Sequence, residues 1–419
     1  MREMEKFPDG TIIEDWFYDT TTKDLEGLGK PYVITDFGVK DDGKVYTKEI
    51  QNVIDQAAEN GGGVVIVPRG TYYSGSLFLK SGVNFYVCKD GMLKGSEDIN
   101  DYALCDTRIE GQCCKYFAAL LNAENINDIV IGGEGTIDGN GLRSWKAFWK
   151  RLEWNPQATN KDEQRPRLLF ISHCSNITVY GLKLQNSCFW TTHIYKSHHV
   201  KLLGCSMQVT HQDIKAPSTD AIDVDVCHDV LIKNCYIKVA DDGLALKGGK
   251  GPWADELPEN GSNERILMED CYMQKAHSPI TCGSESVHNR NILARRIKVG
   301  WVCHILCLKM RPDTPQRYEY IQIEGVTGEV GNVITVMPWT QFFDLKGRTD
   351  MPISKVEHIT VKNCDVEAWK FLNIKESDKY ELRDFTLEKL SLKAKGQDVV
   401  NTIKDGVVEN IRINGVEIV

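Results

Sequence analysis

The feature that most constrains the fold is a strand-like pattern that recurs from about residue 176 onward. In each occurrence, apolar residues alternate with polar ones, a short turn follows, and a second alternating run comes after the turn. The first apolar residue of each occurrence marks its phase, and these markers are Ile177, Val200, Val230, Ile266, Ile292, Ile321, Ile359, Phe385 and Ile411. They recur at intervals of roughly 23 to 38 residues, and a short repeat lengthened by loops is the signature of a parallel β-solenoid. The pattern therefore predicts an all-β chain wound as a parallel β-helix.

A second apolar column follows the first, five residues after each marker. Its members are Leu182, Cys205, Cys235, Cys271, Ile297, Val326, Cys364, Leu390 and Val416. The chain has 14 cysteines, without a CxxC pair or the spacing of a zinc site. Because free cysteine behaves as a small hydrophobe, we expect the four cysteines of this column to stack inside the coils rather than to bind a metal or to act in redox chemistry.

Residues 1–419 are expected to form one β-helix domain. Residues 1–30 are polar with scattered aromatics and indicate an irregular lead-in. Residues 48–60 have apolar side chains at helical spacing and end at a run of glycines, which predicts an amphipathic helix. Since the open end of a solenoid must be covered, we expect this helix to cap it.

The stretch 132–170 is longer than one coil requires and predicts a loop insertion rich in tryptophan and basic residues. Long loops on rigid scaffolds often carry ligand contacts, and aromatic rings suit the apolar faces of sugars. The alternative, that these tryptophans only pack the loop onto the solenoid, is equally consistent with the sequence.

Charge and hydropathy exclude several classes of function. The formal net charge is −9 and no basic run occurs, so a nucleic-acid partner is not expected. No apolar stretch reaches the ~18 residues of a membrane span. The first ten residues lack the apolar core of a signal peptide, so we expect either a cytoplasmic protein or an exported one whose leader lies outside this sequence.

A cluster of aspartates lies between Ser218 and Gly249, and it includes Asp220 and the adjacent pair Asp241 and Asp242. Neighbouring side chains on a strand point to opposite faces, and a buried unpaired carboxylate is costly. An Asp-Asp-Gly sequence alone would suggest a solvated turn. The further aspartates close by favour a carboxylate cluster instead.

Comparison of phase between coils brings histidines to this cluster. His211, Asp241 and His277 each lie 11 residues after a marker. Equal phase in successive coils implies stacking about 4.8 Å apart, so the three residues are predicted to form a file on one face. Asp242 would lie beside this file, and Asp220 would approach it from the adjacent strand.

These residues carry a resemblance. From the ITDFGVKDDG segment near Ile34 to at least Arg311, the chain resembles the polygalacturonase-like glycoside hydrolases of family 28. The motifs that carry the resemblance, with their usual forms Asn-Thr-Asp, Gly-Asp-Asp, Gly-His-Gly and Arg-Ile-Lys, stand here as Ser218-Thr219-Asp220, Ala240-Asp241-Asp242, Ala276-His277-Ser278 and Cys307-Leu308-Lys309. The resemblance implies a right-handed parallel β-helix that hydrolyses pectic chains with inversion.

It also implies residue roles. Asp241 would be the general acid, Asp220 and Asp242 would hold and activate the water, and His277 would tune the acid. Crowded carboxyls raise one another's pKa, which separates an acid from a base near neutral pH. Lys309 would bind the sugar or its carboxylate.

The departures from the family pattern concern the substrate. The family arginine is replaced by Cys307, and Arg311 is the candidate to take over its role, since lysine does not replace a bidentate clamp in kind. The substrate is then either a galacturonide held differently or another sugar such as rhamnose. Further candidates for sugar contact are His211, His193, Trp190 and Trp339.

Bulky segments near the site favour a pocket and exo action on pectic poly- or oligosaccharides. A polysaccharide lyase on the same fold and a non-catalytic glycan-binding solenoid are the alternatives; the lyase would typically need Ca²⁺ on an aspartate cluster. No motif requires a metal or a cofactor, and we expect a monomer. The resemblance suggests a periplasmic or secreted protein, with a cytoplasmic location still open.

Overall fold

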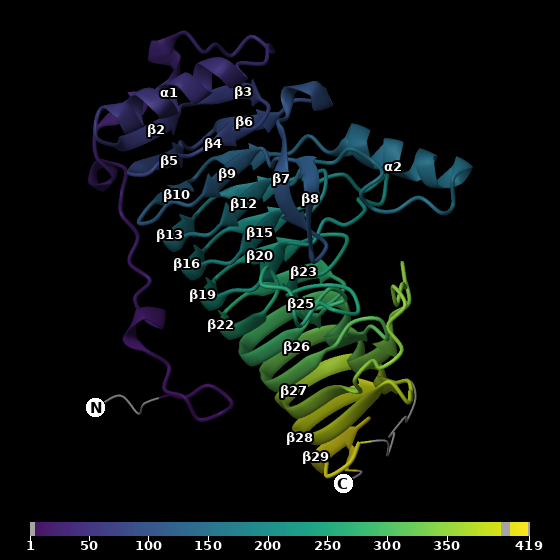
Figure 1. The fold of residues 1–419 in the computed structure, drawn as a ribbon. Coiled ribbons are helices and arrows are strands. Elements are labelled where there is room, and N and C mark those ends of the chain that lie inside the picture. Colours follow the sequence, from purple (N-terminus) through teal and green to yellow (C-terminus); the bar gives the residue numbers. More distant parts are fainter. Residues whose placement is uncertain (1–4, 395–402, 418–419) are drawn as a thin grey trace.

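The chain forms a right-handed parallel β-helix that runs from the N-terminal end to the C-terminal end of the molecule (Figure 1). The computed structural model describes residues 5–394 and 403–417. Within them, a 28-stranded sheet joins each strand to the equivalent strand of the next coil, and the pairs are parallel except for the last one. The predicted fold class is confirmed.

The strands lie on three faces of the solenoid. The first face is formed by β1 (Pro31–Val33), β2 (Gly63–Val67), β5 (Val83–Val87), β10 (Val130–Gly133), β13 (Ser175–Tyr180), β16 (His198–Leu203), β19 (His228–Lys233) and β22 (Ser262–Glu269). The second face is formed by β3 (Gly70–Ser74), β6 (Gly91–Gly95), β11 (Thr136–Asp138), β14 (Lys183–Gln185), β17 (Ser206–Gln208), β20 (Tyr236–Lys238) and β23 (Tyr272–Ala276). The third face is formed by β4 (Leu77–Phe78), β9 (Leu121–Glu124), β12 (Leu169–Ser172), β15 (Thr192–Tyr195), β18 (Ile222–Asp225), β21 (Leu244–Lys247) and β24 (Ile280–Cys282).

Toward the C-terminus the faces merge into longer strands. A single strand such as β25 pairs in turn with β22, β23 and β24. These later strands are β25 (His288–Met310), β26 (Arg317–Pro338), β27 (Ser354–Ile374), β28 (Tyr380–Ala394), β29 (Val407–Ile413) and β30 (Val416–Glu417).

The interior consists of the two predicted columns. The markers from Ile177 to Phe385 pair with one another in register through eight successive coils, and all are buried. The second column, from Leu182 to Leu390, is buried in the same core. The residue before each marker turns a corner with a φ between 50° and 57°. Asn or Asp stands at several of these corners, because these residues tolerate the left-handed conformation.

The last repeat is assigned to the wrong face by the sequence pattern. Ile411 pairs with Leu390 of the second column rather than with Phe385, and Val416 is exposed. Both halves of a coil alternate apolar and polar residues, so the alternation alone does not tell one face from the next.

Helix α1 (Thr47–Glu59) covers the N-terminal end of the solenoid (Figure 1). It buries Ile50, Val53, Ile54 and Ala57, the residues that the helical spacing selects. It lies within one residue of the predicted range 48–60, because the apolar stripe that defines it is also the surface that it buries.

Residues 5–30 of the predicted lead-in 1–30 pack along the outside of the first face (Figure 1), and the first four residues lie outside the described part of the chain. The lead-in contains two short helices, η1 (Asp15–Phe17) and η2 (Glu26–Leu28), and is followed by η3 (Ile34–Phe37). Its apolar side chains contact four outward-facing leucines of successive coils, and the cluster is Phe7, Ile13, Phe17, Leu203, Leu231, Leu267 and Leu293. The lead-in therefore shields an apolar stripe that the coils would otherwise expose.

The stretch 132–170 differs from the predicted loop insertion. Its first residues continue the second face as β11, and helix α2 (Leu142–Trp154) follows and projects sideways from the solenoid (Figure 1). The helix forms because Trp145 and Phe148 recur at helical spacing and are buried together. A hairpin of β7 (Leu104–Ile109) and β8 (Gln112–Phe117), preceded by η4 (Ile99–Asp101), also leaves the solenoid.

Across residues 5–394 and 403–417, no helix is both long enough and apolar enough to span a bilayer.

Candidate active site

A cavity of about 620 Å³ lies over the third face of the solenoid. One wall comes from α2 and the residues after it, and the opposite wall comes from the segment that ends β26 and the residues that follow it. The lining includes Phe148, Trp149, Trp190, Asp220, Asp241, Asp242, Lys247, His277, Glu285, His304, Cys307, Lys309, Trp339 and Phe342. The cavity thus collects acids, bases and aromatic rings from seven successive coils.

Stacked turns position the three aspartates. Asp220 lies just before β18, and Asp241 and Asp242 lie in the turn between β20 and β21. The backbone N–H of Ala221 donates to the carbonyl of Asp242 at 2.9 Å, which places Asp220 one coil away from the pair. The side chains of Asp220 and Asp242 are buried, whereas that of Asp241 is 26% exposed toward the cavity.

Each member of the adjacent pair has its own partners. The Lys309 ammonium lies 2.7 Å from one oxygen of Asp242, and the Thr281 hydroxyl donates to the other at 2.8 Å. Asp241 forms an ion pair with His277, whose Nδ1 is 3.1 Å from its Oδ1. The nearest cation therefore differs between the two neighbours, and His277 lies 4.0 Å from Asp242 as well.

These partners drive the pKa values of the aspartates apart. Burial, together with the charges of Asp241 and Asp223, raises the pKa of Asp220 well above its ordinary value. Burial also disfavours the ionised form of Asp241, but the hydrogen bond from His277 and the charge of Lys309 hold its pKa below the ordinary value. Asp241 in turn raises the pKa of His277 against the effect of burial. The Asp241–His277 pair thus holds one proton. This proton is on the imidazole, which is positively charged, and Asp241 is the carboxylate.

The predicted file of stacked residues continues in the opposite direction from the one expected. The N–H of His277 donates to the carbonyl of Asp241, and the N–H of His304 donates to the carbonyl of His277. His304 was not predicted, because it lies 12 residues after its marker Ile292, out of phase by the bulge between Val299 and Trp301.

His211 does not join this file. Its ring lies 5.9 Å from that of Trp145, outside the cavity lining. The chain makes a long excursion from Val209 to Ala221 between β17 and β18, but a tight turn from Val239 to Gly243 between β20 and β21. Equal distance from a marker therefore does not mean equal position once the loop differs.

Comparisons with known proteins agree with this arrangement. Residues 90–296 match the model of glycosyl hydrolases family 28. These residues, just under half of the chain, belong to this family. The match includes the three aspartates and His277, while Lys309 lies beyond its end.

The chain is also similar to individual proteins. It is 28% identical over 227 residues to the "Probable polygalacturonase" of Vitis vinifera. This alignment covers 52% of this chain and 44% of that protein. The chain spans about half the length of the curated relatives it matches.

Two solved structures share the fold over most of the chain. The hyperthermoactive exopolygalacturonase from Thermotoga maritima has a TM-score of 0.80 at 22% identity and covers 93% of both chains. The family 28 exopolygalacturonase from Yersinia enterocolitica has a TM-score of 0.79 at 19% identity, over 92% of this chain and 75% of that one.

Three of the predicted sugar contacts, Lys309, Trp190 and Trp339, line the cavity. Trp190 lies beneath it, with the Lys247 ammonium 4.9 Å from the ring centre. Trp339 lies on the opposite wall, with the Lys309 ammonium 4.9 Å from its ring centre.

Arg311 and His193, predicted as sugar contacts, lie outside the lining. Arg311 is buried in a bidentate pair with Asp313, at 2.8 Å from each oxygen, and donates to the carbonyls of Gln341 and Phe342. It therefore fixes the wall that carries Trp339 and does not take the place of the family arginine. His193 is fully buried below the cavity between Arg167 and Asp225.

Cys307 stands at the position of the family arginine and lines the cavity. Burial raises the pKa of its thiol to about 12, so it is protonated and not a nucleophilic thiolate near neutral pH. Its place on the outer side of β25 is set by pairing with Thr281.

One group of side chains in the described part of the chain has the donor set for a metal. One donor atom each from Asp241, Asp242 and His277 lies within 4.8 Å of the other two. However, Lys309 already pairs with Asp242, and Asp241 is paired with His277. An ammonium group at 2.7 Å would repel a divalent cation, so we do not assign these residues as metal ligands.

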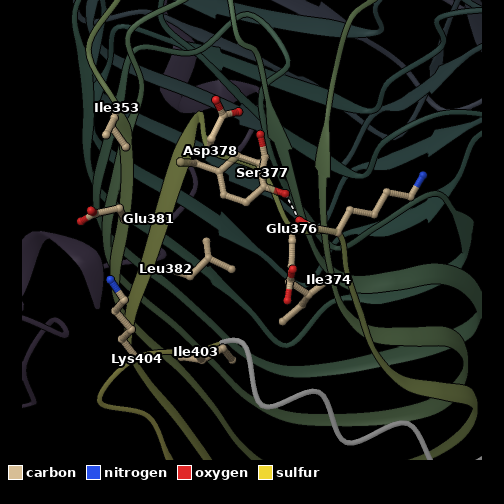
Figure 2. A pocket seen from close by; sticks show the side chains of 11 residues that line it. Ile353, Ile374, Glu376, Ser377, Asp378, Glu381, Leu382, Ile403 and Lys404 are labelled. Carbon is tan, nitrogen blue, oxygen red and sulfur yellow. Dashed lines mark hydrogen bonds between the residues drawn. The ribbon is translucent and has the colours of Figure 1, made fainter.

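A larger cavity, of about 740 Å³, lies at the C-terminal end of the solenoid (Figure 2). Its lining mixes apolar side chains such as Ile374 and Leu382 with the acids Glu376, Asp378 and Glu381. Tyr380 donates to the carbonyl of Lys375 across it. As far as the structure describes this lining, it contains no histidine and no cysteine, so we place the active site in the smaller cavity.

Three residues that line the smaller cavity, Lys247, Glu285 and His304, were not predicted from the sequence. Asp223, which belongs to the predicted aspartate cluster but was given no role, lies outside the lining and 3.6 Å from the Lys247 ammonium. Asp223 and Lys247 alternate with inward residues on β18 and β21, so their outward direction was available from strand alternation. Their approach to Asp220 was not, because it depends on how the coils stack.

Proposed function

We propose that this protein hydrolyses glycosidic bonds in pectic poly- or oligosaccharides with inversion of configuration. The observation that carries the proposal is the Asp241–His277 ion pair facing the buried Asp220 and Asp242 in one cavity lined by tryptophans. Inverting hydrolysis needs a proton donor on one side of the scissile bond and a carboxylate that activates water on the other.

In this mechanism Asp241 donates a proton to the leaving oxygen. That proton comes from the His277 imidazolium, which passes it to the Asp241 carboxylate through their hydrogen bond, so the pair acts as one acid and His277 is left neutral. Asp220 and Asp242 hold the water, and Asp220 in its ionised form accepts the water's proton as the water attacks the anomeric carbon from the opposite face. Lys309 keeps Asp242 oriented.

We further propose exo action. The segment Phe148–Leu152 and the segment Met337–Phe342 wall the cavity on opposite sides, which favours the end of a chain over its middle. The tryptophan rings supply apolar surfaces for sugar faces. A single chain supplies all of these walls, so the proposed active unit is a monomer. By analogy with family 28 relatives we propose that it acts outside the cytoplasm.

The test is a product assay on polygalacturonate, rhamnogalacturonan and their oligomers, with wild type and Asp241→Asn. New reducing ends of inverted configuration that appear only with wild type are expected. A single released sugar at early times supports exo action, whereas a ladder of oligomers contradicts it.

The same assay separates the alternatives. Unsaturated products that absorb ultraviolet light and disappear with a chelator would identify a lyase. Binding without turnover, unchanged in Asp241→Asn, would identify a non-catalytic glycan-binding protein.

A further inference from the structure

Lys247 occupies a buried position directly beneath the candidate site. It ends β21 and points outward from the solenoid, in register with Asp225 of the preceding coil. Its side chain is only 5% exposed, under the ring of Trp190. A lysine is rarely buried to this extent unless it is paired.

Three carboxylates from different segments surround its ammonium group. The Nζ atom lies 3.5 Å from Glu285, 3.6 Å from Asp223 and 3.9 Å from Asp220. It also donates to the carbonyl of Gly283 at 3.3 Å. These residues come from the segment before β18, from β18 itself and from the loop after β24, so Lys247 ties three coils together at one point.

The other nearby cations are engaged elsewhere. Arg108 forms two hydrogen bonds to Asp225, and Lys309 is bound to Asp242. Among residues 5–394 and 403–417, no other ammonium or guanidinium group lies within 4.0 Å of Asp220 or Asp223. Lys247 is therefore the cation that offsets their charge.

Asp223 depends on the Lys247 ammonium more than the other two carboxylates do. It is fully buried, and neither of its oxygens accepts a hydrogen bond from the described residues. Ionised carboxylates in such a place cost several kcal/mol unless a cation is near. A substitution at Lys247 therefore acts on Asp220 and Asp223 together.

We propose that Lys247 is a positioning residue for the water-activating carboxylate Asp220, and that its ammonium group sets the pH range over which hydrolysis proceeds. This inference rests on the proposed function. It assigns Lys247 to the ionisation of the enzyme and not to contact with the sugar.

The direction of the effect follows from the groups that face Asp220. Asp241, Asp223 and Asp242 are acids and favour its neutral form, whereas Lys247 favours the carboxylate. The ammonium itself is stabilised by the charges of four acids, which raise the pKa of Lys247 well above its ordinary value despite burial: Glu285, Asp223, Asp220 and Asp242. Removing the ammonium therefore raises the pKa of Asp220 further, and the acid limb of the pH–rate profile moves to higher pH.

The experiment compares Lys247→Met, Lys247→Arg and the control Lys233→Met. Lys233 is also a strand lysine paired with a buried acid, Glu269, but on the first face. For each variant kcat and KM are measured from pH 4 to 8 on the pectic oligosaccharide that wild type cleaves, together with thermal unfolding. We expect the acid limb of kcat in Lys247→Met to move up by about one pH unit or more, with KM within twofold. Lys247→Arg should keep the limb within about half a unit, and Lys233→Met should not move it.

Two outcomes overturn the proposal. A higher KM with an unchanged limb would make Lys247 a substrate contact, and a lower Tm with an unchanged limb would make it a structural residue. If Lys247→Met does not fold, Lys247→Arg provides the test, because it keeps the positive charge. An acid limb of kcat that moves in Lys247→Arg, with no change in Tm, would contradict the proposal that the charge of Lys247 sets the pH range.

A second readout does not depend on the substrate. Infrared titration of the protonated carboxyl band, assigned by its loss in Asp220→Asn, gives the pKa of Asp220 in wild type and in Lys247→Met. If wild type cleaves no glycan, the proposed function fails, but a carboxyl titration that shifts upward in Lys247→Met still supports the role of Lys247. An unshifted titration would refute it.

Discussion

The two sides of the third-face strands make different uses of one register. On β18 and β21 the inward residues are Ile222, Val224, Leu244 and Leu246, which stack on one another through the coils. The outward residues of the same strands are Asp223, Asp225, Ala245 and Lys247. The inward side repeats one kind of residue, whereas the outward side changes from rung to rung.

Both sides are nevertheless buried. The outward acids and bases are covered by the β7–β8 hairpin, which supplies Arg108, and by the walls of the cavity. Buried apolar groups stabilise by leaving water, while buried charges must be paired in good geometry to break even. The comparison teaches that the inner side makes the coils stable and that the outer side holds charges in defined ionisation states.

The largest expected effect is on the outer side, at Asp241. Asp241→Asn removes the acid and should lower kcat by about 10²- to 10⁴-fold. Because Asp241 faces the cavity and not the core, the unfolding temperature should fall no further than in His277→Gln, which breaks the same ion pair. Steady-state kinetics and calorimetry on the same preparations check this. Loss of activity that merely follows loss of folded protein would contradict the comparison.

The next effect is on the inner side of β21, one residue from Lys247. Leu246→Ala deletes a fully buried side chain and should destabilise the protein by about 2–5 kcal/mol. Denaturant unfolding measures this loss, and kcat of the folded fraction should stay close to that of wild type. A large fall in kcat at full folding would show that the two sides are not independent.

A smaller effect is expected for His277→Gln, which removes a hydrogen bond to a charged group and should lower kcat roughly ten- to hundredfold. Its stability effect depends on pH. The pKa of His277 is raised in the folded state, so its pairing with Asp241 contributes fully below about pH 6.5 and is lost as pH rises through the raised value.

His304 provides the control with the opposite sign. Burial lowers the pKa of His304 to about 4. Its neutral form is favoured in the folded protein, so stability due to this residue is present above about pH 6.5 and is lost as pH falls. The Tm difference between wild type and His277→Gln should therefore shrink from pH 5 to pH 8, while that for His304→Gln should grow. Parallel curves would argue against the assigned shifts.

The smallest effect is expected in the cysteine column. Cys235→Ala leaves an inner position apolar and should cost about 1 kcal/mol, with no change in kcat. Denaturant unfolding under reducing conditions tests it. A loss of activity or of bound metal in this variant would contradict a purely structural role.

The sequence predicted the inner side far better than the outer one. Each apolar marker is buried and packs against other apolar markers, so the spacing of apolar residues is enough to identify them. Asp220, Asp241, Asp242 and His277 were found through motifs, and their assembly in one cavity could not be tested before the coils were stacked.

The residues misplaced by the sequence share a physical cause. His211 leaves the file because its loop is longer, and Arg311 turns back to Asp313 inside the wall. Lys247 approaches Asp220, and Glu285 approaches Lys247, only through the stacking of three coils. Loop paths and contacts between coils depend on side-chain packing, which a count of residues from a marker does not contain.

The contacts of the lead-in also constrain the order in which the nascent chain can fold. Its Glu5 pairs with Arg295, and the N–H of Asp9 donates to Asn291, contacts that span 290 and 282 residues of chain. A ribosome adds about 5–20 residues per second, so the lead-in waits on the order of tens of seconds for these partners to emerge. During that interval the apolar side chains of Phe7, Ile13 and Phe17 are exposed to water, because the outward leucines that cover them have not yet been synthesised.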